Sequence, residues 1–145
     1  MKSITKAALA ALFMAGLAAP AFAEDEEVVV TFESVLDTKD RKGRGLETDI
    51  KLVFANDKGN KTSGSPDSAK GFKLGRARDK KEACRLALLQ ALMKFQNKAR
   101  LSHKTSVTNI KTAATDAFWS GDRNKCLCLG GGSNVRTTVT GNFND

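Results

Sequence analysis

The segment from Asp79 to Arg100 constrains the fold most, because it has the features of one long amphipathic helix. Asp79 suits an N-cap and Glu82, three residues later, completes a capping-box pattern that would satisfy unpaired amides of the first turn. Apolar residues then recur at helical spacing and would share one face: Cys84, Leu88, Ala91, Leu92, Phe95 and Ala99. Such a face must be buried, and the remaining segments predict a sheet as its partner.

Five shorter segments predict that sheet, because they are rich in β-branched residues or alternate in polarity. They cover residues 28–32, 49–54, 106–112, 125–129 and 135–140. The last two flank the flexible segment Gly130–Asn134 and predict a closing hairpin, and residues 33–42 predict a short helix. The expected fold class is α+β, with one principal helix packed on a largely antiparallel sheet and a disulfide between them.

Two further segments connect these elements. Residues 56–71 collect Gly, Asn, Ser, Asp and Pro and contain a single apolar residue, an alanine, which predicts a long, exposed and mobile loop. Phe118 and Trp119 form an aromatic pair in a predicted connection. We expect this pair to pack over the open end of the sheet, since large aromatic side chains contribute heavily to small cores. The alternative is an exposed anchor for a partner.

Residues 1–23 have the features of a secretory signal peptide. Lys2 and Lys6 give a positive start, residues 7–19 form an apolar run, and residues 21–23 read Ala-Phe-Ala, which fits a cleavage site. The run is shorter than a membrane-spanning helix requires. Removal of this segment would leave residues 24–145 as a single domain of 122 residues and lower the formal charge from +8 to +6. The sequence therefore predicts a periplasmic or secreted protein.

Three cysteines carry the clearest chemistry. Export to an oxidising compartment would allow thiols to pair. Cys84 lies on the apolar face of the predicted helix, and Cys126 and Cys128 share one face of a predicted strand because strand side chains alternate. Either strand cysteine could reach Cys84, so the spacing predicts a helix-to-sheet disulfide without choosing its second partner. The remaining cysteine would be a spare or reactive thiol.

Four segments taken together also carry a family resemblance: residues 49–54, 81–84, 107–110 and 139–143. From Val28 to Phe143 the chain resembles the small exported proteobacterial proteins often mislabelled as excinuclease ABC proteins, whose core motifs are similar to those of RcsF-like envelope domains. The resemblance implies an RcsF-like domain over residues 24–145 and an envelope protein of undefined activity. It also implies a Cys84–Cys128 bond, with Cys126 as the additional cysteine.

No residue pattern specifies a catalytic reaction. The nearest approach to a phosphate loop, residues 59–66, has Ser-Pro after its second glycine and lacks the required Lys and hydroxyl, which argues against a nucleotide hydrolase. The single histidine, His103, has no Ser or Cys partner set by a motif. We therefore expect a non-catalytic protein without a cofactor.

Zinc binding and thiol exchange are weaker alternatives. Cys84, Cys126, Cys128 and His103 could in principle form a tetrahedral zinc site, but a disulfide would compete for the same sulfurs. Arg123 and Lys125 could favour a reactive thiolate at Cys126, although no Cys-x-x-Cys pair begins a helix. We expect neither a metal site nor redox catalysis.

The basic residues gather in three clusters. They are Lys39, Arg41, Lys42 and Arg44; Arg76, Arg78, Lys80 and Lys81; and Lys94, Lys98, Arg100 and Lys104. Two clusters brought together would form an anion-binding surface. The leading expectation is an exported envelope accessory domain that binds an envelope or secreted protein. The alternative is a polyanion-binding protein that recognises lipopolysaccharide phosphates or nucleic acid.

Overall fold

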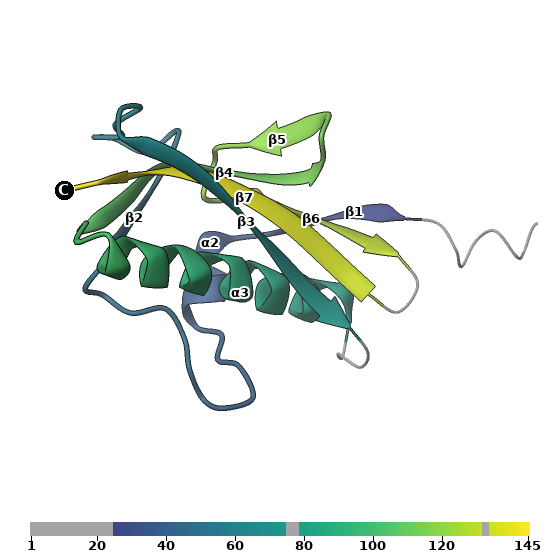
Figure 1. Ribbon diagram of the computed structural model, residues 1–145. Helices are drawn as coiled ribbons and strands as arrows, with labels where there is room; N and C mark the ends of the chain where they lie inside the picture. The colour runs from purple at the N-terminus through teal and green to yellow at the C-terminus, as the bar shows by residue number, and fades with distance from the viewer. Residues whose placement is uncertain (1–24, 75–78, 132–133) are drawn as a thin grey trace, which may run out of the picture.

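The computed structural model describes residues 25–74, 79–131 and 134–145. The predicted signal peptide, Arg76 and Arg78 lie outside the described residues. The described chain forms two layers, with one long helix lying along one face of a curled sheet (Figure 1). No helix within these ranges is both long enough and apolar enough to cross a membrane.

The elements follow one another as β1 (Glu26–Val30), α2 (Phe32–Leu36), β2 (Lys51–Phe54), β3 (Ser65–Leu74), α3 (Lys80–Leu101), β4 (Ser106–Thr115), β5 (Phe118–Ser120), β6 (Cys126–Gly131) and β7 (Asn134–Asn144). The main strand order is β1-β6-β7-β4-β2, with β3 paired to β7 and β5 paired to β4. Every pair is antiparallel except β2 with β4. The predicted fold class, one principal helix on a largely antiparallel sheet, is confirmed.

Helix α3 begins and packs as its sequence predicts. The Asp79 carboxylate accepts a hydrogen bond from the Glu82 amide at 2.8 Å, which caps the first turn. All six residues of the predicted apolar face are buried, and they pack with inward residues of β1, β3, β6 and β7. The sheet thus supplies the apolar partner that the helix requires.

A disulfide joins this helix to the sheet. Cys84 of α3 is bonded to Cys128 of β6, with the two Cα atoms 5.7 Å apart. Cys126 lies two residues before Cys128, is also buried, and remains a free thiol. The predicted helix-to-sheet bond is confirmed, and its second partner is the cysteine that the family resemblance implied.

Strand β3 corrects the loop predicted at residues 56–71. Residues 65–74 pair with β7 in unbroken antiparallel register, from Ser65 opposite Phe143 to Leu74 opposite Asn134. Among residues 65–73 only Ala69 and Gly71 are buried, and a Cβ added at Gly71 would overlap the backbone carbonyl of Ala87 in α3. Because α3 crosses so closely, the inward side chains must be small, and the strand lacks the apolar alternation that normally reveals one.

Three smaller predictions were also wrong in extent or placement. The first strand ends at Val30, and Thr31 caps α2 by accepting from the Ser34 amide, so Phe32 begins a helix that ends at Leu36 and not near residue 42. The Gly130–Asn134 segment is partly strand, because β6 reaches Gly131 and β7 begins at Asn134.

The aromatic pair does not pack over the sheet. Phe118 and Trp119 are 60% and 41% exposed on β5, which extends from the sheet as part of the β4–β5 hairpin (Figure 1). The burial expected from their size is wrong, since this hairpin projects away from the α3 side of the sheet.

A candidate anion-binding groove

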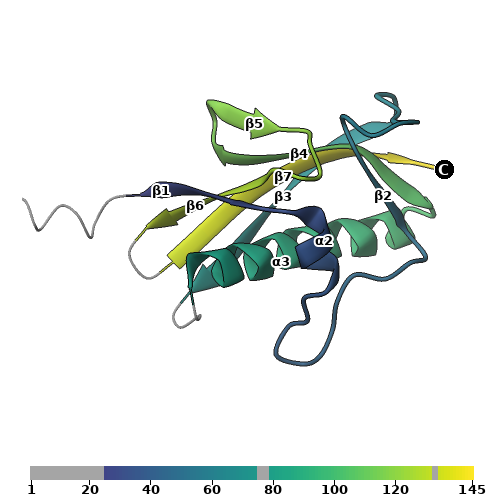
Figure 2. The same ribbon diagram turned by 180° about the vertical axis from the view of Figure 1, so that it is seen from behind.

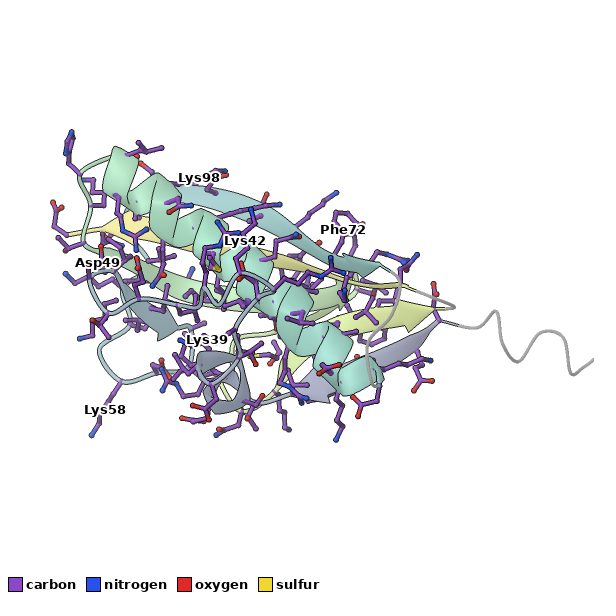
Figure 3. The ribbon with its side chains drawn as sticks, turned by 90° about the horizontal axis from the view of Figure 1, so that it is seen from below. Lys39, Lys42, Asp49, Lys58, Phe72 and Lys98 are labelled. Atoms are coloured by element: carbon purple, nitrogen blue, oxygen red, sulfur yellow. A yellow bond between two sulfur atoms is a disulfide. The ribbon has the colours of Figure 1, made fainter. Side chains whose placement is uncertain are left out.

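A groove of about 720 Å³ lies between the segment 40–44 and the outer side of α3. Its apolar floor comes from Leu86, Leu89 and Met93 of α3, and Phe72 of β3 lies at its edge. Five cations surround that floor: Arg41, Lys42, Arg44, Lys73 and Lys94. In Figure 3 the labelled Lys42 lies over α3, and Phe72 projects from β3. We call this hollow the basic groove.

The segment 40–44 is a closed loop built around Asp40. The Asp40 carboxylate accepts from the backbone amides of Lys42 at 2.9 Å and Arg44 at 2.8 Å, and it pairs with the Arg44 guanidinium at 2.9 Å. The hydrogen bond from the Arg44 amide is the largest of the effects that hold the Asp40 pKa below its usual value. Gly43 supplies the left-handed turn, with φ at 77°. This loop presents Arg41 and Lys42, which form no ion pair within the described residues.

Helix α3 holds the rest of that connection in place. Gln96 is only 2% exposed, and its side chain donates to the carbonyls of Glu47 and Ile50 and accepts from the Glu47 amide. Arg100 pairs with Asp49 at 2.6 Å and with Glu47 at 2.7 Å. The connection between α2 and β2 lies below α3 in the view of Figure 2. These contacts anchor the base of the connection and so position the basic loop beside the helix.

The structure unites only part of the predicted basic clusters. Arg41, Lys42, Arg44 and Lys94 meet in the groove, while Lys39 lies in an adjoining hollow beside Arg44 and Gly45. Several of the others are engaged by carboxylates: Lys80 with Glu26, Lys98 with Asp67, Arg100 with Asp49 and Glu47, and Lys104 with Asp145. Lys81 lies in a separate hollow with Arg85 near Val29 of β1.

Sequence reasoning missed the β3 side of the groove. Lys73 and Phe72 belong to β3, whose strand character the sequence hides, and no charge cluster includes Lys73. The ring of Phe72 is 47% exposed beside the cations. An apolar residue and a lysine directly after the polar segment 56–71 were the available signal for this part of the groove.

The free cysteine is poorly suited to thiol exchange. Cys126 is 1% exposed, and burial raises the pKa of its thiol to about 12. Arg123 lowers this pKa less than burial raises it, and its guanidinium lies 5.1 Å from the Phe32 ring centre and 3.2 Å from Asp57. The effect of burial therefore outweighs the stabilisation of a Cys126 thiolate that the sequence suggested for Arg123.

The four residues considered as alternative zinc ligands are dispersed between the core and the surface. Two of the three sulfurs are joined in the disulfide, and His103 is exposed after the end of α3, at a φ of 58°. Across the described ranges, no group of three or more His, Cys, Asp or Glu side chains is placed to hold a metal ion.

No family model matches the chain, and neither a curated protein nor a solved structure is significantly similar to it. What the groove can bind therefore follows from its own charge and shape. Five cations and the single carboxylate of Asp40 surround an apolar floor. This arrangement suits a ligand that combines negative charges with apolar groups.

Proposed function

We propose that the chain is an exported, non-catalytic binding domain of the cell envelope, and that its basic groove binds an acidic segment of a protein partner. The observation that carries this proposal is the basic loop. Arg41 and Lys42 are held beside an apolar floor by Asp40, without carboxylate partners of their own among the described residues. A loop whose backbone is already held in this way loses little backbone freedom on binding, which favours association.

A protein segment fits the groove better than a polyanion does. A polyanion with a charge at each repeat needs a continuous track of available cations. Lys80, Lys98 and Arg100 of α3 already pair with carboxylates of the same chain, so the cations of the groove do not continue along the helix as such a track. A peptide can offer carboxylates to the cations and apolar side chains to Met93 and Phe72.

The proposal is tested by titrating the purified protein with a synthetic ten-residue peptide of alternating Glu and Val. Comparison ligands are the corresponding Lys–Val peptide and inorganic polyphosphate, each at low and moderate salt. We expect saturable binding of the acidic peptide alone that weakens as salt rises, because the contacts are partly ionic. Tighter binding of polyphosphate would favour the polyanion function and overturn this proposal.

Variants locate the binding site. The double variant Arg41→Glu/Lys42→Glu should bind the acidic peptide at least tenfold more weakly than the parent. The matched control, Lys58→Glu/Lys111→Glu, makes the same change in net charge at exposed positions outside the groove, and Figure 3 shows Lys58 well away from Lys42. Equal weakening by both variants would mean that net charge, not the groove, attracts the peptide.

A further inference from the structure

The outer edge of β3 borders the basic groove, and side chains of α3 occupy it. The Phe72 amide donates to Gln90 Oε1 at 2.8 Å, and Lys94 Nζ donates to the Lys70 carbonyl at 2.8 Å. Gln90, Lys94 and Phe72 all line the groove. Two backbone groups of the sheet thus meet side chains at the position where a neighbouring strand would lie.

This pattern extends along the strand. Lys98 of α3 pairs with Asp67 at 2.9 Å, so Gln90, Lys94 and Lys98, four residues apart on the helix, engage successive positions of β3. Asp67 also accepts from the Ser68 amide, and Pro66 has no amide to offer. One stripe of α3 therefore closes the β3 edge, which in an open sheet would be a template for another chain.

The side chains of α3 satisfy fewer of the outward backbone groups of β3 than a neighbouring strand would. The N–H and C=O of one strand residue point to the same side, so Lys70 and Phe72 each direct both groups away from β7. Gln90 meets one of these groups and Lys94 meets another. Both side chains are long and rotatable, so an incoming backbone can replace them at the cost of modest rotamer rearrangement. It would also reach the Lys70 amide and the Phe72 carbonyl.

We propose that the acidic segment binds as an extended strand added to the outer edge of β3 at Lys70–Phe72, and displaces the Gln90 and Lys94 side chains. This inference rests on the proposed function and specifies how the partner is held. Backbone hydrogen bonds supply affinity in strand addition, and alternate side chains supply specificity.

The surroundings of this edge define the partner's sequence pattern. Side chains of an added strand alternate between the two faces of the sheet. Those on the α3 side lie near Arg41, Lys42 and the released Lys94, which favours carboxylates. Those on the opposite side lie near the exposed ring of Phe72, which favours apolar residues. The partner is thus an extended segment with acidic and apolar residues in alternation.

N-methylated peptides test strand addition separately from charge. In one Glu–Val peptide the amides of every second residue are methylated, and in its matched control the intervening amides are methylated instead. Both peptides keep all carboxylates, but only one keeps the amides that face β3. We expect one methylated peptide to bind at least tenfold more weakly than the unmodified peptide, and the other to bind within about threefold of it.

Amide exchange provides a second measurement. When the unmodified peptide saturates the protein, exchange of the Lys70 amide should slow at least tenfold, because a partner carbonyl then covers it. Exchange of the Lys111 amide in β4, away from the groove, serves as the internal reference. Equal binding of both methylated peptides, with an unchanged Lys70 rate, would overturn strand addition while leaving the groove's preference for acidic peptides intact. Absence of binding by the unmodified peptide would overturn both proposals.

Discussion

Removal of the Cys84–Cys128 bond provides the most direct test of how this small domain is stabilised. The bonded cysteines are 44 positions apart in the chain, and the closed loop contains most of α3, all of β4 and β5, and the start of β6. The perturbation is the double variant Cys84→Ala/Cys128→Ala. Cys126→Ala is the matched control, because it also removes a buried sulfur but opens no covalent loop.

The expected loss follows from the length of the closed loop. The chain-entropy model assigns a closed loop of this length about 4 kcal/mol of stability at 25 °C, through restriction of the unfolded chain. Each buried sulfur contributes roughly 1 kcal/mol more through apolar burial and packing. The double variant should therefore lose about 6 kcal/mol and the Cys126→Ala control about 1 kcal/mol.

Guanidinium unfolding followed by circular dichroism measures both losses. With a slope of about 3 kcal/mol per molar, the double variant should unfold at roughly 2 M lower denaturant than the parent. If it is unfolded in buffer alone, titration with trimethylamine N-oxide allows its stability to be extrapolated. The reasoning fails if the double variant loses no more than twice the loss of Cys126→Ala, since the closed loop would then contribute nothing.

Three further predictions concern the core and the connection that carries the basic loop. Gly71→Ala should cost about 3 kcal/mol in thermal or chemical unfolding, because its Cβ would overlap the Ala87 backbone, whereas Gly59→Ala, with open space around it, should cost about 1 kcal/mol for its positive φ. Gln96→Ala should cost roughly 2–3 kcal/mol and weaken peptide binding, because it leaves the buried carbonyl of Ile50 and two partly buried backbone groups of Glu47 unpaired. The raised pKa of Cys126, about 12 in the fold against an ordinary 9.0, stabilises the protein below pH 9 and stabilises it progressively less between pH 9 and 12. Relative to Cys126→Ala, the parent should therefore lose on the order of 1 kcal/mol between pH 8 and pH 10, and pH-independent differences would contradict this assignment.

Sequence reasoning succeeded where the determining interactions are local or periodic. The N-cap at Asp79 and the apolar repeat through Ala99 both lie within the helix itself, so they could be read without knowledge of its partner. The shared face of Cys126 and Cys128 likewise follows from strand geometry. The choice of Cys128 depends on where β6 lies beneath α3, which spacing alone does not specify.

The basic groove illustrates what sequence reasoning could not reach. Lys98 appeared to belong to a basic cluster, but it pairs with Asp67, which is 31 positions away in the chain. The loop that carries Arg41 reaches α3 because Gln96 and Arg100 hold residues 47–50 against the helix. Which cations remain available is therefore a tertiary property, set by carboxylates that are distant in sequence.

The close approach of α3 to β3 links the stability of this fold to its proposed binding mode. The contact of Gly71 with the Ala87 backbone brings the helix near enough for Gln90 and Lys94 to reach the strand edge. The Cys84–Cys128 bond ties the same helix to β6, so the helix cannot easily withdraw from the sheet. An incoming strand must therefore move side chains and not the helix, which limits the structural change that binding requires. A rigid helix with two movable side chains can thus close the edge of β3 in the free protein and still allow a suitable partner to open it.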